Sequence, residues 1–232
     1  MSTPALVWWT VPDPAAVDHP LLDSTERARC SAYRREVDAA RHATGRVLLK
    51  RVVAAWCGTR PDEVRVVPES GGRPRVVLGT GTATPWVSIT HAGGVVGVAL
   101  AGQPCGLDVQ DLAAIEPVIG SDLVYSALER DTLTRLPTAE RRDAACSWWV
   151  AKEAVLKAAG CGVVEPMPGV DGRAARVRLD VAGRRLELVR LVVAAPEGHR
   201  AALAVQTAGP VDVRLRSLAG ASSDLGGEDP AP

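Results

Sequence analysis

Short apolar runs recur along the chain, and in several of them apolar and polar residues alternate. Runs of this kind, bounded by Gly, Pro and Ser, predict β-strands. The expected strands cover residues 5–10, 63–68, 75–79, 86–90, 95–101, 106–110, 174–180, 184–194 and 200–206. Pro12 and Pro14 end the first strand, because proline cannot donate to a sheet ladder.

Other segments repeat their apolar residues at helical spacing. Two helices are expected between Ser24 and about Trp56, and Asp23 or Ser24 can cap the first of them. Further helices are predicted over 121–136 and about 139–159. The last of these is rich in Ala, Leu, Lys and Glu and is followed by Gly160, which is a plausible helix terminator.

The layout of strands and helices in the first half recurs in the second, which suggests two similar halves. The segment VLLKRVVAAWCG at 47–58 also resembles AVLKAAGCG at 154–162. We expect an N-terminal half over 1–103 and a C-terminal half over 104–217, joined near residues 101–104. The tail over 218–232 is rich in Gly, Ser, Asp and Pro, and we expect it to be disordered.

Candidate chemistry gathers in the expected strand 106–110 and the helix that contains residues 146–160. Alternation places Asp108 and Gln110 on the same side of the strand. Glu153 and Lys157 are neighbours on the helix surface, because they are four residues apart. Such oxygen ligands suit Mg²⁺ and hence phosphoryl chemistry, although a Glu and a Lys at this spacing also form an ordinary exposed helix pair.

Four motifs carry a family resemblance. They are W-x-x-K-E-A-x-x-K at 149–157, G-L-D-V-Q at 106–110, G-R-P at 72–74 and V-S-I-T-H at 87–91. In this order they resemble the signature elements of the 4′-phosphopantetheinyl transferases, and the length and two-part layout resemble their surfactin-synthetase-activator class. The likeness runs from about Val7 to about Val205.

The resemblance implies an α/β (α+β) fold of two pseudosymmetric halves. Each half is a small, mainly antiparallel sheet packed with helices, and the active site lies at their interface. The implied reaction moves the 4′-phosphopantetheine arm of coenzyme A to a serine of an apo carrier protein and releases adenosine 3′,5′-bisphosphate. Asp108, Gln110 and Glu153 are the implied Mg²⁺ ligands, Glu153 the general base and Lys157 a stabilising cation, which makes Asp108, Glu153 and Lys157 the catalytic group.

The resemblance also implies a set of coenzyme contacts. Arg41 and Arg46 lie in an R-H-x-x-G-R segment similar to the N-terminal coenzyme-binding helix of the family. Arg73 stands where the family usually has Lys and can bind phosphate with two donors. The complete expected set is Arg41, Arg46, Arg73, Thr90, His91 and Lys152.

The motifs depart from the family at two positions, which leaves other functions open. Gln110 stands where bacterial members often have Glu, so Mg²⁺ binding is expected to be weaker. Val150 stands where Ser or Thr is usual after the Trp. One alternative is a catalytically weakened relative that binds coenzyme A or carrier proteins, and another is a metal-dependent nuclease with a carboxylate and lysine core.

Composition restricts the partners. The 27 basic residues balance the 27 acidic residues, which disfavours a general nucleic-acid binder. No apolar run is long enough to span a bilayer, and the N-terminus lacks the basic region of a secretory signal. The five cysteines form no C-x-x-C pair and are expected to be buried thiols. We therefore expect a cytoplasmic protein, and we also expect a monomer. The family resemblance implies that its partners are coenzyme A and a polyketide, peptidyl or fatty-acid carrier protein.

Overall fold

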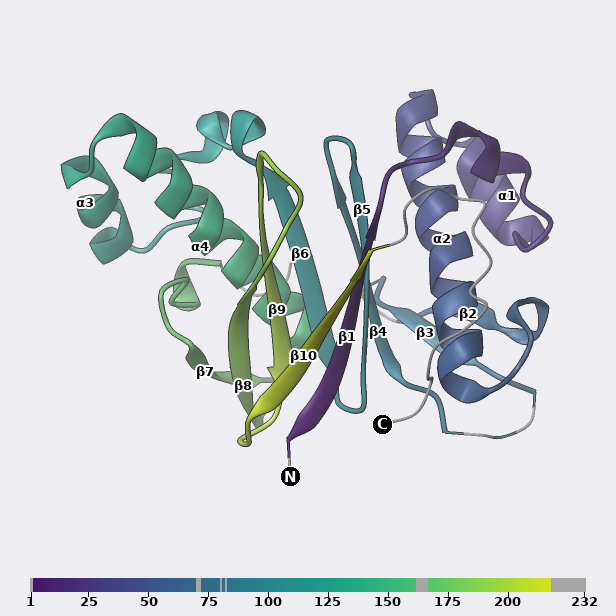
Figure 1. Ribbon diagram of the computed structural model, residues 1–232. Helices are drawn as coiled ribbons and strands as arrows, with labels where there is room; N and C mark the ends of the chain where they lie inside the picture. The colour runs from purple at the N-terminus through teal and green to yellow at the C-terminus, as the bar shows by residue number, and fades with distance from the viewer. Residues whose placement is uncertain (1, 70–71, 80, 82, 162–166, 218–232) are drawn as a thin grey trace.

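The computed structural model describes residues 2–69, 72–79, 81, 83–161 and 167–217. Two four-stranded sheets lie between two groups of helices, as Figure 1 shows. The expected tail over 218–232 lies outside the described residues. The mixed α/β class and the mainly antiparallel pairing predicted from the sequence are confirmed.

The N-terminal lobe consists of one four-stranded sheet, a two-stranded hairpin and two helices. Its sheet contains, in spatial order, β10 (Val211–Ser217), β1 (Thr3–Thr10), β5 (Val95–Ala101) and β4 (Trp86–Ala92). The hairpin and helices are β2 (Arg65–Pro68), β3 (Pro74–Val77), α1 (Ser24–Ser31) and α2 (Glu36–Cys57). Leu49 and Val53 of α2 pack on one face of the sheet against Val98 and Leu100, which buries that face.

The C-terminal lobe has one sheet and two helices. Its sheet contains, in spatial order, β6 (Cys105–Asp111), β9 (His199–Gln206), β8 (Arg184–Val193) and β7 (Arg176–Val181), and its helices are α3 (Ala127–Arg135) and α4 (Thr138–Ala159). Ala154 and Val155 of α4 pack against Leu188 and Ala204. Short 3₁₀ helices occur at Pro14–Asp18, Pro61–Glu63, Leu112–Ala114, Glu116–Val118 and Met167–Gly169.

The two lobes share a topology. In the N-terminal lobe β5 lies between β1 and β4 and is antiparallel to both, and in the C-terminal lobe β9 lies between β6 and β8 in the same manner. Each lobe also has a 22-residue helix, α2 or α4, that ends at a glycine in the left-handed region, Gly58 (φ 64°) or Gly160 (φ 74°). This arrangement confirms the predicted pair of similar halves.

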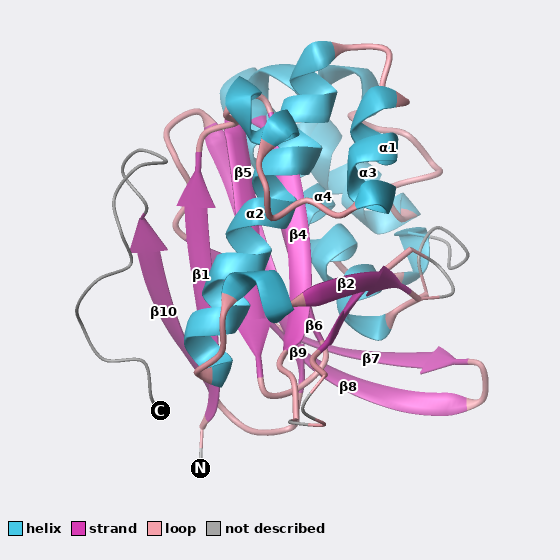
Figure 2. Cartoon of the chain, turned by 90° about the vertical axis from the view of Figure 1, so that its right-hand side faces the viewer, coloured by secondary structure: helices cyan, strands magenta, loops and turns pink. Residues whose placement is uncertain are grey.

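Strand β10 crosses from the C-terminal part of the chain back to the N-terminal lobe. It pairs in parallel with β1, from Thr3 opposite Val211 to Trp9 opposite Ser217, and Figure 2 shows the two strands side by side at one edge of the sheet. The sequence analysis predicted no strand here and assigned residues up to 217 to the C-terminal half. The N-terminal lobe therefore includes a segment from the end of the chain.

The helix expected over 121–136 begins later than predicted. The Ser126 hydroxyl accepts from the backbone N–H of Glu129, and the Glu129 carboxylate accepts from the N–H of Ser126. This capping box fixes the start of α3 at Ala127, because it satisfies backbone donors that would otherwise lack partners. The capping box is an S-x-x-E pattern in the sequence.

The inner faces of the two sheets share one core. Val7 and Ala99 from the N-terminal sheet and Leu107 and Leu203 from the C-terminal sheet belong to a single buried cluster. The sheets come together at one edge, where hydroxyl groups of β4 accept hydrogen bonds from backbone N–H groups of β6. This seam brings the V-S-I-T-H and G-L-D-V-Q motifs side by side.

Candidate active site

Helix α4 lies very close to strand β6 because a glycine stands between them. A Cβ atom at Gly106 would lie 2.1 Å from the carbonyl oxygen of Ala154 and 2.5 Å from the amide nitrogen of Ala158. Any larger residue would force the helix away from the strand. The close approach places Lys157, one turn beyond Glu153 on α4, next to Asp108 on β6.

Asp108 is the centre of a buried hydrogen-bond network. It is 6% exposed, and its Oδ1 accepts from Lys157 Nζ at 2.5 Å and from Thr90 Oγ1 at 3.1 Å. Lys157 Nζ also donates to the carbonyl oxygen of Leu107 at 3.1 Å. The aspartate therefore joins a cation from α4 to a hydroxyl from the other lobe.

Glu153 lies half-buried near the same carboxylate. Burial raises the pKa of Glu153, the negative charge of Asp108 raises it further, and the positive charge of Lys157 opposes both. Asp108 is thus close enough to Glu153 to disfavour its charged form, and a cation between the two carboxylates would oppose this repulsion. The structure thus brings together Asp108, Glu153 and Lys157, the three residues predicted to be catalytic.

Gln110 follows Asp108 by two residues on β6 and is half-buried. Both side chains are on the same side of the strand, as the alternation predicts. The backbone carbonyl oxygen of Gln110 accepts a weak hydrogen bond from the Cys146 thiol, with Sγ 3.7 Å away. Within the described residues no three His, Cys, Asp or Glu side chains form a cluster that could hold a metal ion. An oxygen set here would combine the Asp108 and Glu153 carboxylates, with the Gln110 amide as a further candidate ligand.

Residues 104–191, which contain β6, α3 and α4, match the family model of the 4′-phosphopantetheinyl transferase superfamily. Over this segment the chain is similar to the superfamily. The matched segment contains Asp108, Glu153 and Lys157, the three residues that meet at the seam.

Three curated proteins are similar to part of the chain. The Synechocystis protein slr0495, named provisionally as a 4′-phosphopantetheinyl transferase, is 29% identical over 146 residues. The transferases psf-1 of Bacillus pumilus and HetI of Nostoc are 27% and 25% identical over 145 and 148 residues. Each alignment covers 62% of this chain, and the chain spans 58%, 60% and 62% of the three relatives.

Two of the predicted coenzyme contacts, Arg41 and His91, lie near the cluster of Asp108, Glu153 and Lys157. Arg41 of α2 donates to the carbonyl oxygen of Gly93, in the turn after His91, and to Asp38 at 2.9 Å. Crowding by protein atoms lowers the pKa of His91, and the charges of Arg41 and Lys157 lower it further, although part of the ring remains exposed. His91 is therefore mostly neutral at pH 7 and lies among cations that suit an anionic ligand.

Arg46 lies deeper in the N-terminal lobe. Its Nε atom is 4.0 Å from Glu26 Oε1, and its Nη1 atom is buried with no hydrogen-bond partner among the described residues. Its positive charge contributes to the lowered pKa of His42, and the charge of His91 contributes as well. Arg46 thus interacts electrostatically with His42, which is also influenced by His91, and within the described part of the chain it forms no hydrogen bond or ion pair with Asp108.

Arg73 bridges the two lobes. Its guanidinium group lies 4.6 Å from the centre of the Trp86 ring and donates to Glu69 Oε2 at 3.0 Å. A third contact, 3.4 Å long, reaches the carbonyl oxygen of Ala158 near the end of α4. Arg73 therefore lies beside the helix that carries Glu153, with part of its donor capacity already used.

Lys152 does not support the expected coenzyme contact. Its side chain is fully buried, and Nζ donates to Glu129 Oε2 at 2.8 Å and to the carbonyl oxygens of Met167 and Val170 at 3.0 and 2.6 Å. Since an ammonium group has three donors, all of them are used inside the C-terminal lobe. The geometry assigns Lys152 a structural role.

Sequence reasoning gave no role to Glu129 or Gly106, although both had a signal. Glu129 is the last residue of an S-x-x-E capping pattern, and Gly106 precedes the apolar core of its strand, where glycine often marks a close backbone approach.

None of the helices in the described ranges is long and apolar enough to cross a membrane.

Proposed function

We propose that the protein transfers the 4′-phosphopantetheine arm of coenzyme A to a serine of an apo carrier protein and releases adenosine 3′,5′-bisphosphate. The proposal is supported by the match of residues 104–191 to the superfamily model, together with the proximity of Asp108, Lys157 and Glu153 at the seam between the lobes. We extend it to carriers of polyketide, peptide or fatty-acid synthesis, and to action as a cytoplasmic monomer, as expected from the motifs.

Glu153 is the proposed general base. The serine of the carrier must lose a proton as its oxygen attacks the β-phosphorus of coenzyme A. A carboxylate with a raised pKa accepts that proton more readily than an ordinary surface carboxylate does. Burial and Asp108 raise the pKa of Glu153, so the environment of this residue supports the assignment.

Lys157 is the proposed electrostatic partner of the phosphate groups. Its ammonium group binds Asp108, and the Lys157 side chain is 31% exposed, so this residue contacts both the carboxylate and the solvent. Positive charge at this point opposes the repulsion between an incoming oxygen and the anionic pyrophosphate. Arg41, Arg73 and His91 add donors from the N-terminal lobe.

Asp108 and Glu153, with the Gln110 amide, are the proposed holders of Mg²⁺. The donor set fits a hard cation, because two carboxylates close enough to affect each other's charge are stabilised by a shared divalent ion. When bound, Mg²⁺ supplies positive charge to the pyrophosphate oxygens. A neutral amide in place of a carboxylate weakens this site, so Gln110→Glu is expected to lower the Mg²⁺ concentration needed for half-maximal rate.

The experiment is a mass measurement of apo carrier proteins after incubation with the pure protein, coenzyme A and Mg²⁺. A panel of fatty-acid, polyketide and peptidyl carriers is used, and a mass gain of one phosphopantetheine arm is expected on at least one of them. Glu153→Gln should reduce the rate by about 10²- to 10⁴-fold with an unchanged circular dichroism spectrum. Bound coenzyme A without transfer to any carrier would favour the weakened, binding-only relative, and cleavage of DNA would favour the nuclease.

A further inference from the structure

Two hydroxyl groups of β4 bind the edge of β6 where the lobes meet. Ser88 Oγ accepts from the backbone N–H of Leu107 at 3.0 Å, and Thr90 Oγ1 accepts from that of Val109 at 3.2 Å. The two side chains are 5% and 4% exposed. They alternate along β4, so the same device occurs twice in succession along one seam.

Of the two hydroxyl groups, that of Thr90 also hydrogen-bonds to Asp108 in the candidate active site, whereas that of Ser88 does not. A hydroxyl group has one proton, and the geometry uses the proton of Thr90 for Asp108 Oδ1, at 3.1 Å. Since Thr90 Oγ1 accepts from Val109, its orientation is fixed by the backbone of the strand that carries Asp108. A directed chain thus runs from the Val109 N–H through Thr90 to the carboxylate.

The carboxylate of Asp108 is held from two sides. Thr90 approaches Oδ1 from the N-terminal lobe, and Lys157 approaches the same atom from α4 at 2.5 Å. Two donors on one oxygen restrict rotation of the carboxylate about its bond to Cβ, which also fixes the direction of Oδ2. A ligand whose direction is fixed before binding loses less entropy when a cation arrives.

We propose that Thr90 is a positioning residue that orients Asp108 for the cation and the phosphates, in place of the coenzyme contact expected from its motif. The inference rests on the proposed function for its biological purpose. Its physical basis is the burial of the hydroxyl and the use of both its proton and a lone pair within the seam. Because Asp108 and Thr90 come from different lobes, the aspartate is correctly oriented only when the lobes are docked.

The test compares three variants with the wild-type protein. Thr90→Val keeps the shape of the side chain and removes the hydroxyl, Thr90→Ser keeps the hydroxyl, and Ser88→Ala removes the neighbouring seam hydroxyl that does not bind Asp108. Mg²⁺ is titrated into each protein by calorimetry, with and without coenzyme A, and transfer kinetics are measured on a carrier that the wild type modifies.

Thr90→Val is expected to weaken Mg²⁺ binding about 10- to 100-fold, the usual effect of losing a hydrogen bond to a metal ligand. It should lower kcat and leave the KM for coenzyme A close to that of the wild type. Thr90→Ser and Ser88→Ala should bind Mg²⁺ nearly as the wild type does. Thermal unfolding of all four proteins shows whether the variants fold.

Three results would overturn the inference. They are a raised KM for coenzyme A in Thr90→Val with unchanged Mg²⁺ affinity, an equal loss of affinity in Ser88→Ala, and no Mg²⁺ binding by the wild type. Failure of the proposed function is recognised separately. If the wild type modifies no carrier but Thr90→Val alone loses Mg²⁺ affinity, the positioning role of Thr90 stands and the transferase proposal does not.

Discussion

The two lobes contain the same kind of buried ion pair, but the three proposed catalytic residues all come from one of them. Lys50 of α2 and Lys152 of α4 each lie eight residues before the glycine that ends their helix (50 to 58, and 152 to 160). Lys50 donates to Glu26 at 2.6 Å, and Lys152 donates to Glu129 at 2.8 Å. Both glutamates occupy the third position of a short preceding helix, where they complete a capping box.

This equivalence corrects the similarity between residues 47–58 and 154–162. That similarity matched Lys50 with Lys157, whereas the ion pairs and helix ends match Lys50 with Lys152. The counterparts of Glu153 and Lys157 in α2 are then Arg51 and Ala55. The Lys and Glu pair is therefore a structural feature that both lobes share, whereas the proposed catalytic residues Asp108, Glu153 and Lys157 all come from the C-terminal lobe.

The two ion pairs differ in how completely they are satisfied. Glu129 accepts from the N–H groups of Ser126 and Gly172 as well as from Lys152. Glu26 Oε1 has no hydrogen-bond partner among the described residues, and its neighbour Arg46 is 4.0 Å away. Both carboxylate oxygens of Glu129 thus accept hydrogen bonds. In the N-terminal lobe, Arg46 is a second cation close to Glu26.

The largest expected effect is loss of the complete pair. Lys152→Ala leaves the buried carboxylate of Glu129 without its cation, which costs about 3–5 kcal/mol in the free energy of unfolding. Lys50→Ala should cost less, because Arg46 can move closer to Glu26. Urea denaturation of both variants measures the difference.

The double variant Lys152→Met with Glu129→Gln is the control for this prediction. It removes both charges, so it should be more stable than Lys152→Ala. Equal losses of unfolding free energy in Lys50→Ala and Lys152→Ala would show that Arg46 does not compensate for the loss of Lys50.

The next effect concerns the glycines that let each long helix approach its sheet. Gly106→Ala places a Cβ atom against the backbone of α4, at 2.1 Å from the Ala154 oxygen, and overpacking of this kind costs about 1–3 kcal/mol. It should also reduce transfer, since Lys157 moves with the helix. In Gly45→Ala of α2 the Cβ atom would lie 3.0 Å from the Ile89 Cγ2 methyl and 3.5 Å from the Val96 Cγ1 methyl, so it meets side chains rather than backbone. The variant also gains helix propensity of about 1 kcal/mol. Thermal unfolding and the transfer rate of the two variants are compared, and a worse result for Gly45→Ala would contradict the prediction.

Local patterns explain most of what the sequence predicted. The strands and long helices follow from apolar spacing, and Glu153 and Lys157 lie on one face because four residues separate them. The meeting of Asp108 with Lys157 came from a motif resemblance, because the two residues are 49 positions apart. The structure confirms that contact.

The features that the sequence did not reveal depend on distant partners. Lys152 was expected to contact coenzyme A, but it is buried against Glu129, 23 positions away. Strand β10 pairs with β1 at the opposite end of the chain, and nothing in its own alternation identifies that partner. The V-S-I-T-H motif likewise does not reveal that the Thr90 hydroxyl donates to Asp108.

A change of pH should affect the stability of the two lobes in opposite directions, because each contains a partly buried ionisable group whose charged form is disfavoured by burial. Burial, together with the positive charges of Arg46 and Arg29, lowers the pKa of His42 to about 4. The unfolded chain therefore binds more protons between pH 6.5 and 4, so stability falls as the pH falls through that window. The loss is about 1–2 kcal/mol after allowance for solvent screening, and His42→Asn should remove it in urea denaturation at pH 7, 5 and 4.

Glu153 should give the opposite slope in the C-terminal lobe. Its raised pKa means that the folded protein holds the proton more tightly than the unfolded chain. Stability therefore decreases as the pH rises from the ordinary value of 4.5 through the raised pKa. Glu153→Gln should be more stable than the wild type at pH 7 in the presence of EDTA and equal to it at acidic pH. A difference that persists at acidic pH would point to a packing effect.

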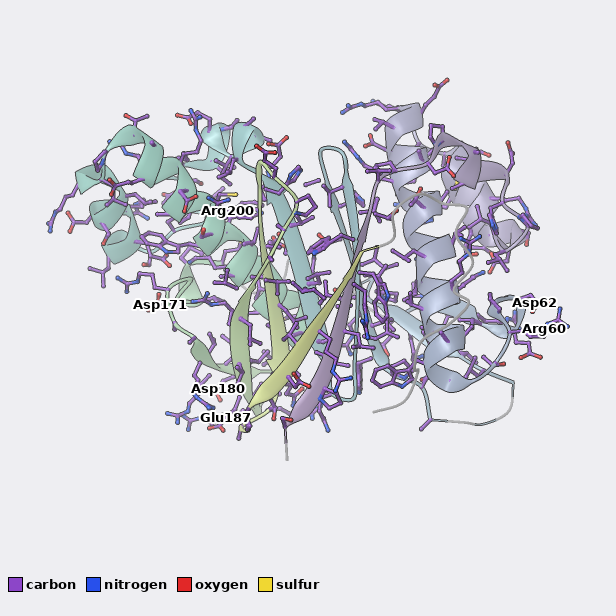
Figure 3. The ribbon with its side chains drawn as sticks, in the orientation of Figure 1. Arg60, Asp62, Asp171, Asp180, Glu187 and Arg200 are labelled. Carbon is purple, nitrogen blue, oxygen red and sulfur yellow. The ribbon has the colours of Figure 1, made fainter. Side chains whose placement is uncertain are left out.

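The smallest effect is expected for an ion pair with good geometry and no burial. Arg60 donates to both carboxylate oxygens of Asp62, at 3.0 and 2.7 Å, and the two side chains are 76% and 54% exposed. Figure 3 shows them together at the outer side of the N-terminal lobe, beyond α2. Water already solvates both charges and salt screens them, so pairing gains little. Asp62→Asn should leave the unfolding temperature unchanged at low and high salt, whereas a loss as large as that of Lys50→Ala would show that geometry, rather than burial, gives the Lys and Glu pairs their importance.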